Sequence, residues 1–396
     1  MRVVCPVFLA LFIASPARAQ DVPQPESVAQ QRQAADTAPS WQYGAFLDVG
    51  YLRSSTEPAN HLFRNRGTTP RVDEWDVNVA GAYAKKTASE HSRLGFEMIA
   101  QAGEDTKIFG FSATAPNLGG ADILLHFGPV NVSYLAPVGK GLTIQGGIFS
   151  SLIGYDSLYA KDNFSYTRPW GADYTPYLMM GVNASYPVSE KLTGAVGVVN
   201  GYWHLAHAND APTIIGQLAY RATEHVSVKE TGLYGSHQAN TDLAFWRFLS
   251  DTIVERKSEP MTIAFEYQIS TEQVDATGKP LALWTSAQLP VHWVFRAPWS
   301  VTVRPEFAWD RDGRWISGRL GSGQSVRAVT TTLEYRTSRK GAQAILRLEH
   351  RYDDSRGAAG GFFDGADTAA GVPALTPNQH ILIGAVIVTF DRTFPR

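Results

Sequence analysis

The sequence has almost no cysteine, no surplus of one charge and no long apolar run, and each of these absences excludes a class of protein. Its single cysteine, Cys5, excludes a disulfide framework and any site built from several thiolates. The 35 basic and 37 acidic residues leave no basic surplus for a polyanion, so we expect no nucleic-acid partner. The least charged stretch, residues 123–139, is interrupted by Pro129 and Pro137, so no transmembrane helix is expected.

The N-terminal residues have the three parts of a secretory leader. Arg2 precedes an apolar run over residues 3–14, and residues 17–19, Ala-Arg-Ala, match a small-x-small cleavage site. We therefore predict a signal peptide over residues 1–19. Its removal would also remove Cys5, and a large exported chain without cysteine is typical of the bacterial envelope.

Two kinds of segment follow the leader. Residues 20–40 are rich in Gln, Ala and Pro without an apolar period, so we predict a flexible periplasmic segment, with a short helix over 26–35 as the alternative. Beyond residue 40, apolar and polar residues alternate over about ten residues at a time, the length of a tilted strand that crosses a bilayer. In one segment, for example, Phe265 and Tyr267 lie on the face opposite Glu266. The expected strands cover residues 41–53, 71–85, 92–103, 122–136, 141–150, 175–187, 190–201, 213–222, 224–234, 243–256, 260–271, 281–289, 298–310, 325–337, 341–353 and 378–391.

The connections between these strands alternate in length, which is typical of an outer-membrane barrel. The short ones are residues 86–91, 137–140, 187–189, 257–259 and 338–340. We therefore predict an all-β fold over residues 41–396: a transmembrane antiparallel β-barrel of about 16 strands, with short periplasmic turns and long extracellular loops. Residues 290–298 do not fit, because they form a long segment where a short turn is expected. The alternative is a soluble β-sandwich, whose polar face would meet solvent.

Aromatic residues lie near the ends of the expected strands, which predicts two girdles at the membrane interfaces and outer-membrane lipid as a partner. These residues are Trp41, Tyr51, Trp75, Tyr83, Tyr134, Tyr177, Tyr186, Trp299 and Trp309. In the segment 75–83, Trp75, Val77, Val79 and Tyr83 are expected on the face opposite Asp76 and Asn78.

Residues 147–210 contain several short motifs in order. These motifs are Gly147-x-Phe149, Ile153-Gly154-Tyr155-Asp156, Asn163-x-Ser165, a strand opened by Pro176 with Gly181 and Tyr186, and Asn200-Gly201. In order and spacing they resemble the OmpL-like family of β-barrel porins, although Asp156 and Tyr202 replace the Glu and Trp expected there. The resemblance implies an outer-membrane channel and no particular solute.

A barrel of sixteen strands is wide enough for a water-filled lumen whose polarity depends on the inward side chains. The residues predicted to form the lumen wall are Asp48, Asp76, Glu97, Glu266, Arg304, Glu306, Arg327, Arg347, Glu349 and Arg351, together with Glu230 and Arg336. The basic members cluster in the late strands, which predicts a field across the pore. The alternative is that these charges merely pair and hydrate the wall.

The longest loop, residues 151–174, separates the fifth and sixth expected strands. We predict that it folds inward and constricts the channel, with an ordinary extracellular loop as the alternative. Its candidate constriction residues are Tyr155, Asp156, Lys161, Asp162, Arg168 and Asp173.

The sequence gives little support for catalysis, a metal site or a cofactor. His204, His207 and Asp210 have ligand-like spacing but lie in an expected loop, where no helix aligns the imidazoles. The glycines of 318–323 lack the strand-to-helix setting of a phosphate loop. His350 lies on an expected strand without a convincing serine partner, and the same holds for His380. We therefore expect no enzyme, no metal and no cofactor.

Together these patterns predict an outer-membrane porin that forms a water-filled channel for small hydrophilic solutes. The alternative is a plugged outer-membrane barrel that acts as a surface-binding protein or a barrel enzyme. The expected partners are outer-membrane lipid, the solutes and the barrel-assembly machinery, which would recognise either Phe390 or Phe394 near the C-terminal end. Homo-oligomerisation is left open.

Overall fold

The computed structural model describes residues 40–109, 121–206, 209, 211–238, 241–275, 281–316, 320–368 and 371–395. The expected signal peptide and nearly all of the segment 20–40 lie outside these residues, as do His207, Asp210 and Gly318. Within the described ranges, no helix is both long and apolar enough to span a membrane.

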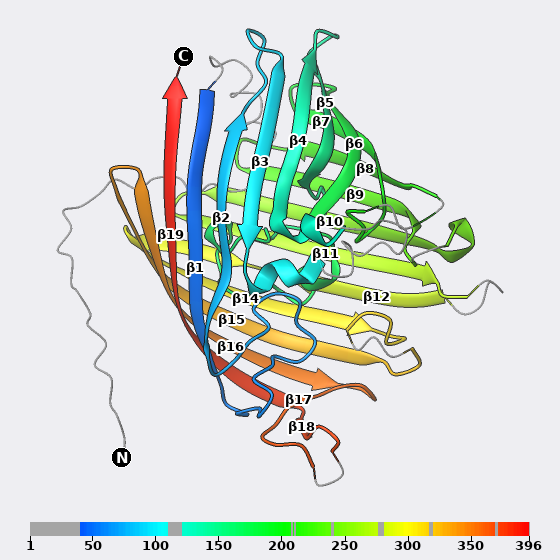
Figure 1. Ribbon diagram of the computed structural model, residues 1–396, viewed down its shortest axis with the longest axis vertical. Coiled ribbons are helices and arrows are strands. Elements are labelled where there is room, and N and C mark those ends of the chain that lie inside the picture. The colour runs from blue at the N-terminus through cyan, green and yellow to red at the C-terminus, as the bar shows by residue number, and fades with distance from the viewer. Residues whose placement is uncertain are drawn as a thin grey trace.

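The chain forms an antiparallel sheet that closes into a barrel (Figure 1). Its strands are β1 (Ser40–Ser54), β2 (Trp75–Lys86), β3 (Leu94–Ala102), β4 (Phe127–Ala136), β5 (Leu142–Ser150), β6 (Leu178–Pro187), β7 (Leu192–Val199), β8 (Thr213–Arg221), β9 (Val226–Ser236), β10 (Trp246–Ser258), β11 (Met261–Gln273), β12 (Leu281–Gln288), β13 (Val291–Arg296), β14 (Trp299–Asp310), β15 (Gln324–Arg339), β16 (Ala342–Arg356) and β19 (Asn378–Pro395). A separate hairpin pairs β17 (Phe362–Phe363) with β18 (Leu375–Thr376). Short 3₁₀ turns are η1 (Glu104–Phe109), η2 (Ala121–His126), η3 (Ala160–Asp162), η4 (Ala172–Tyr174) and η5 (Leu243–Phe245).

Pairing between the first and last strands closes the barrel. β1 hydrogen-bonds to β2 on one side and to β19 on the other, in a register that runs from Ser40↔Pro395 to Ser54↔Ile381. The blue and red ribbons therefore lie side by side in Figure 1. Closure leaves no strand edge exposed to hydrocarbon, where an unpaired N–H or C=O would cost several kcal/mol. The predicted antiparallel barrel is confirmed.

The twelfth barrel position is shared by β12 and β13, which explains the segment that did not fit the sequence pattern. Both strands pair with β11 and with β14, one after the other. Pro290 separates them because it has no N–H to donate, while its carbonyl still accepts from Ala264 N at 3.0 Å. Residues 291–296 thus continue the strand, and the short turn falls at 297–298. Counted this way, the barrel has the sixteen strands that were predicted.

A β-bulge in β2 reverses the orientation expected for the residues that follow it. The register against β1 shifts between Asp48↔Val79 and Val49↔Val77, so that Asn78 is the extra residue. Trp75 and Val77 point outward as predicted, but the alternation reverses after the bulge. Val79 is therefore buried inside the barrel, and the Tyr83 hydroxyl donates to Asp391 within it.

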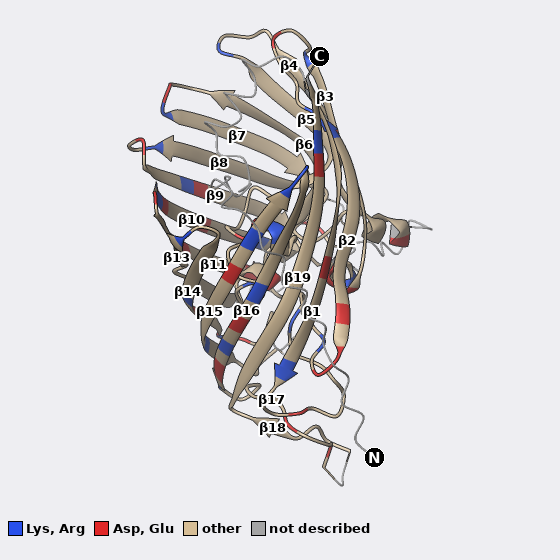
Figure 2. Ribbon diagram, turned by 90° about the vertical axis from the view of Figure 1, so that its left-hand side faces the viewer, with Lys and Arg blue, Asp and Glu red and all other residues tan. Residues whose placement is uncertain are grey.

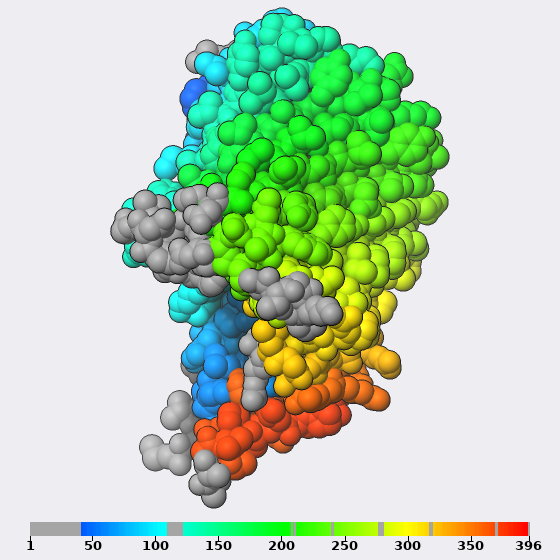
Figure 3. Space-filling view, turned by 90° about the vertical axis from the view of Figure 1, so that its right-hand side faces the viewer, coloured from blue at the N-terminus to red at the C-terminus, as the bar shows by residue number. Residues whose placement is uncertain are grey.

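The outer wall is an apolar belt with aromatic residues at both ends. Figure 3 shows this wall continuing from the green strands through yellow to orange. At the end with the short turns, ring contacts join Trp41 to Phe96, Tyr43 to Phe394, Trp293 to Phe295 and Trp299 to Tyr335. At the opposite end they join Tyr51 to Trp75 and Tyr234 to Trp246. Two tyrosines that were expected in a girdle lie elsewhere. Tyr177 is buried in the lumen, and Tyr83 points inward.

The outward face can be tested with an arginine in the apolar belt. Leu348 points away from the lumen and is 54% exposed, whereas Val138 is 56% exposed in a short turn. We expect Leu348→Arg to lower the free energy of unfolding by about 2–4 kcal/mol, because the guanidinium would face hydrocarbon. Urea unfolding in lipid vesicles measures this change. Val138→Arg is the control, and an equal loss in both variants would contradict the assigned face.

Candidate functional site: the lumen loop and the wall that holds it

The loop between β5 and β6, residues 151–177, folds into the barrel, and we name it the lumen loop. Tyr166, Arg168 and Trp170 in its middle are completely buried, although each carries a polar group. Buried polar groups are stable only when they are hydrogen-bonded. The contacts of this loop with the inner wall therefore decide its position.

The first turn of the lumen loop is held by two carboxylates on neighbouring strands. Asp251 of β10 accepts from Gly154 N at 2.8 Å, and Glu266 of β11 accepts from Tyr155 N at 3.0 Å. Gly154 has a φ of +91°, a conformation that residues with a Cβ rarely adopt. The glycine thus allows two successive N–H groups to face the wall.

The middle of the lumen loop is held in the same way by late strands. Glu349 of β16 accepts from Tyr166 N at 2.6 Å and from Thr167 N at 3.0 Å. Glu306 of β14 accepts from Trp170 N at 2.5 Å. Hydrogen bonds to ionised groups are stronger than neutral ones, so wall carboxylates suit a loop whose N–H groups have no strand partner.

Wall arginines hold the carbonyl groups of the same loop. Arg347 donates to the carbonyls of Ala160 at 2.8 Å and Ser165 at 3.1 Å, and also to that of Asn163. Arg351 donates to the carbonyl of Arg168 at 3.3 Å. The alternating charges of β15 and β16, visible as blue and red bands in Figure 2, thus match the alternating donors and acceptors of a peptide backbone.

The loop also reaches β1, so its contacts extend over the wall from β10 to β16 and on to the first strand. The Tyr166 hydroxyl donates to Asp48 at 2.6 Å and accepts from the side-chain amide of Asn78 at 2.5 Å. A Cβ at Gly50 would lie 2.5 Å from that hydroxyl oxygen, so only glycine leaves room for the ring.

The loops that follow β1 and β3, at the end of the barrel opposite the short turns, pack on the lumen loop through buried ion pairs. Arg168 pairs with Asp105 at 3.1 Å, and Asp173 pairs with Arg66 at 3.0 Å. Asp105 also accepts from Thr69 N at 2.6 Å. Burial raises the pKa of Asp105 to about 7, and the nearby Arg168 guanidinium opposes this shift. Burial likewise raises the pKa of Asp156.

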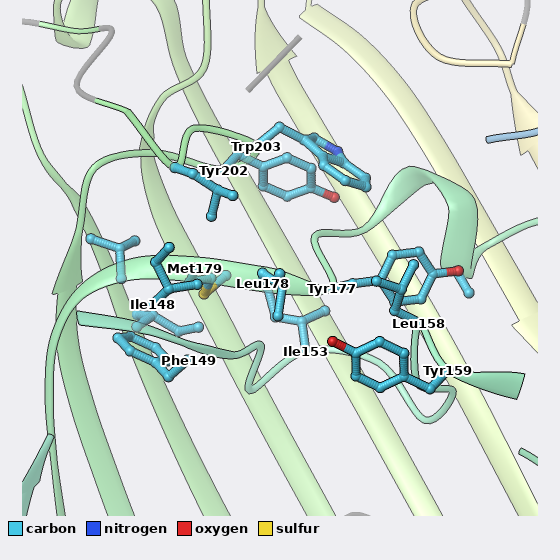
Figure 4. Close-up of a cluster of buried hydrophobic side chains, with 14 of the residues drawn as sticks. Ile148, Phe149, Ile153, Leu158, Tyr159, Tyr177, Leu178, Met179, Tyr202 and Trp203 are labelled. Atoms are coloured by element: carbon cyan, nitrogen blue, oxygen red, sulfur yellow. The ribbon is translucent and has the colours of Figure 1, made fainter. Parts of the chain in front are cut away.

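An apolar cluster covers the other side of the lumen loop. Figure 4 shows Leu158 and Tyr159 of the loop beside Ile153, and Phe149 and Met179 of the adjoining strands belong to the same cluster. The hydroxyl of Tyr159, the polar group of this buried side chain, donates a hydrogen bond to the side chain of Gln101 at 2.7 Å. Apolar packing toward β3–β10 and polar contacts toward β10–β16 therefore fix opposite sides of the loop.

The structure brings together most of the residues predicted for the constriction and the wall. Four of the predicted constriction residues lie in the lumen: Tyr155, Asp156, Arg168 and Asp173. The contacts of Tyr155, Arg168 and Asp173 are described above, and Asp156 accepts a hydrogen bond from the side chain of Gln288 at 2.6 Å. Lys161 pairs with its neighbour Asp162 at 2.8 Å. The inward faces of the strands carry Asp48, Asp76, Glu97, Glu266, Arg304, Glu306, Arg347, Glu349 and Arg351.

Arg327 and Glu230 were assigned to the wrong face. Arg327 alternates with Val326 and Ala328, which are buried inside the barrel, so its exposed side chain points outward with Val329. Glu230 points outward as well, and the hydroxyls of Ser250 and Thr252 donate to its carboxylate. Arg327 lies near the start of β15, so the tip of its long side chain can reach polar headgroups from the outer face.

The wall charges form local pairs, which favours the alternative to a field across the pore. Glu306 pairs with Arg351 at 2.8 Å and with Arg304 at 3.5 Å. Glu334 pairs with Arg347 at 2.8 Å and with Arg336 at 3.0 Å. The inward-facing arginines of β14–β16 thus each have an acid beside them, and little net positive field remains in this sector.

Several residues of the site were absent from the sequence prediction. Asp353 continues the inward alternation of Arg347, Glu349 and Arg351, so the period of two could have found it. Asp105 and Arg66 lie in irregular loops, where no periodic signal marks which residue turns inward. Only the folded chain brings them to the lumen loop.

The described residues contain no group of three or more His, Cys, Asp or Glu side chains that could hold a metal ion. His204 Nε2 instead lies 2.8 Å from the carbonyl oxygen of His237. The outward imidazoles of His350 and His380 hydrogen-bond to each other at 3.1 Å. In the part of the chain that is described, neither imidazole pairs with a serine hydroxyl.

Comparisons with solved structures identify the class of fold. OmpT of Vibrio cholerae, in a structure described as the in-vitro folded trimer form, matches with a TM-score of 0.55 and 8% identity over 90% of this chain and 100% of that one. An OmpT mutant of the same organism that lacks loop L8 matches with a TM-score of 0.53, 10% identity and coverage of 90% and 100%. An anion-selective porin from Comamonas acidovorans matches with a TM-score of 0.50, 10% identity and coverage of 89% and 100%.

The fold is therefore that of an outer-membrane porin barrel. The sequence model of the family described as "Putative beta-barrel porin-2, OmpL-like" matches residues 40–390. The chain belongs to this family. No curated protein sequence matches it.

Glu349 is the wall residue whose change should loosen the lumen loop most directly. In Glu349→Gln, one carboxylate oxygen that accepts an N–H becomes an amide donor, at a cost of about 1.5–3 kcal/mol per lost hydrogen bond. We expect hydrogen exchange of residues 163–170 to accelerate at least about tenfold. Asp354→Asn, on the outward face of the same strand, is the control. Equal exchange in the wild type and Glu349→Gln would contradict the role of this contact.

Paired variants can test that Arg347 points into the barrel and Arg327 points away from it. Arg347→Gln removes donors to three carbonyl groups of the lumen loop, so we expect faster proteolysis of that loop in the folded barrel. Arg327→Gln changes only the outer surface and should leave the cleavage rate at the wild-type value. Limited proteolysis of detergent-solubilised protein, with the heat-dependent gel shift as the test of folding, measures both. Faster cleavage in Arg327→Gln alone would overturn the assignment.

Proposed function

We propose that this porin-family protein forms a water-filled channel for the diffusion of small hydrophilic solutes, constricted by the lumen loop. The observation that carries the proposal is the position of this loop across the inner wall, with backbone contacts to Asp251, Glu349 and Glu306. The half-buried side chains of Gln145 and Gln217 and the buried side chain of Asn183 line the barrel on the side of β5–β8, and these polar groups support a hydrated path there.

The predicted constriction residues have distinct roles in the proposed channel. Arg168 holds the loop to its neighbours by donating to the Tyr166 carbonyl at 3.2 Å and pairing with Asp105. Asp156 faces the wall of β12 through Gln288, while Lys161 and Asp162 neutralise each other. The proposed channel does not need catalysis or a cofactor, because diffusion through a polar lumen needs only space and hydration.

The family and the barrel support an outer-membrane setting for the proposed channel. We propose export through the N-terminal leader, residues 1–19, followed by a periplasmic segment and insertion of the barrel by the assembly machinery. The short turns then face the periplasm and the lumen loop starts from the extracellular end. The trimer form reported for OmpT of Vibrio cholerae supports homo-oligomerisation of this chain as part of the proposal.

A second candidate function is a plugged barrel that binds a ligand at the cell surface. The observation that favours it is the complete burial of Tyr166, Arg168 and Trp170 beneath the neighbouring loops. A loop that fills the lumen at all times would block diffusion. Ion conductance of the purified protein separates the two functions.

Deletion of residues 158–170 tests the constriction. Removal of the loop segment that crosses the inner wall should widen the path, so we expect a larger single-channel conductance in planar bilayers than for the wild type. Arg168→Gln, which keeps the segment but removes its charge, should change conductance less than the deletion does. Wild-type and deleted proteins with the same conductance and selectivity would refute the constriction. A folded wild type that never conducts would refute the channel and favour the plugged barrel.

A further inference from the structure

The part of the barrel wall formed by β4–β8 carries almost no charge. These five strands contain no Lys, Asp or Glu, and their one arginine, Arg221, is the last residue of β8. Inward charges begin on the flanking strands, with Glu97 on β3 and Lys229 on β9. The inner face of β4–β8 is lined instead by amides and hydroxyls, which we name the amide wall: Asn131, Ser133, Thr143, Gln145, Asn183, Ser185, Thr193 and Gln217.

The amide wall is a regular array, because most of its members lie opposite one another on paired strands. One row consists of Thr143, Ser185, Ala195 and Gln217, and the next row consists of Ser133, Gln145, Asn183 and Gly197. Neighbouring strands are about 4.8 Å apart, and the two rows are about 7 Å apart along each strand. Because β7 contributes only an alanine and a glycine to these rows, no large side chain of that strand covers the polar groups.

Hydrogen bonds within the wall fix the orientation of its amides. Gln145 donates to the side-chain oxygen of Asn131 at 2.9 Å and accepts from the side-chain amide of Asn183 at 3.1 Å. Gln145 is half-buried, and an amide has two N–H groups and two acceptor sites, so one donor and one acceptor remain for a solute. Gln217 donates to a carbonyl of the lumen loop at 2.7 Å and to a β9 hydroxyl at 3.0 Å, so its Oε1 atom remains as an acceptor.

The hydroxyls of the wall are available as well. Thr143, Ser185 and Thr193 are half-buried, and their hydroxyls form no hydrogen bond with another group of the described chain. A hydroxyl donates and accepts at once, so each can exchange water for a solute hydroxyl without losing a hydrogen bond. On the opposite side of the lumen, by contrast, Glu349 is engaged by the lumen loop and Arg351 by a neighbouring acid.

We propose that the amide wall binds neutral polyhydroxylated solutes, such as sugars and polyols, and that the channel favours these solutes. This inference rests on the proposed channel function. A sugar presents several hydroxyls around one ring, so it can replace its bound water with several groups of the array at once. A solute of similar size with few hydroxyls would leave polar groups of the wall unpaired. An ion gains little here, because the wall supplies no charge to offset the loss of hydration.

Obstruction of the ion current by glucose tests this inference. In planar bilayers, a solute that binds in the lumen lowers the potassium chloride conductance in a saturable way, whereas a solute that does not bind lowers it only through the bulk solution. We expect glucose to reach half of its full effect below about 0.1 M. Triethylene glycol, which is similar in size but has only two hydroxyls, should show the bulk effect alone.

A variant without three of the hydroxyls assigns this effect to the amide wall. T143V/S185A/T193V removes these groups without breaking a hydrogen bond of the described chain. We expect it to raise the half-saturating glucose concentration at least about fivefold, because the solute loses several hydrogen bonds. Thr331→Val, which makes the same kind of change on the outward face of β15, is the matched control and should keep the wild-type value.

The outcomes separate the inference from the function on which it rests. A wild type that conducts but responds alike to glucose and triethylene glycol overturns the inference and leaves the channel intact. A wild type that folds but does not conduct overturns the channel and the inference together. A triple variant with the wild-type half-saturation overturns the role of the amide wall. If the triple variant fails to fold, Thr143→Val alone must raise the half-saturating concentration, and an unchanged value overturns the inference.

Discussion

The structure depends on one requirement: a backbone without water must find hydrogen-bond partners within the protein. In the strands this requirement forces closure, and β1 satisfies it by pairing with both β2 and β19. The lumen loop meets the same requirement without a sheet. Its N–H groups find Asp251, Glu266, Glu349 and Glu306, and its carbonyls find wall arginines. The charged wall is therefore a template for a folded loop as much as the lining of the proposed channel.

This template explains why acids and bases alternate on the inner faces of β14–β16. A peptide backbone presents donors and acceptors in turn, and Arg347, Glu349 and Arg351 present the complementary groups in turn. The same residues pair with one another, so their charges cancel locally. The same kind of local pair joins Arg247 of β10 to Glu272 of β11.

The period of two in the sequence was sufficient for the fold, because a strand that separates lipid from lumen must alternate. It failed where the alternation itself is broken or ambiguous. The bulge at Asn78 turns Val79 inward, Pro290 divides one strand in two, and Arg327 lies outside because its neighbours Val326 and Ala328 occupy the inner face. The contacts of Arg168 with Asp105 join two irregular loops, and no local pattern predicts such a pairing.

The contact between the lumen loop and the wall can be measured with two introduced cysteines. The hydroxyls of Ser165 and Thr332 lie 3.1 Å apart, and the described chain contains no native cysteine to compete with them. Oxidation of the variant S165C/T332C in outer membranes, followed by mass spectrometry of linked peptides, reports on their distance. The structure predicts an efficient disulfide between loop and wall. A folded barrel in which both thiols stay free would contradict a lumen loop held against β15.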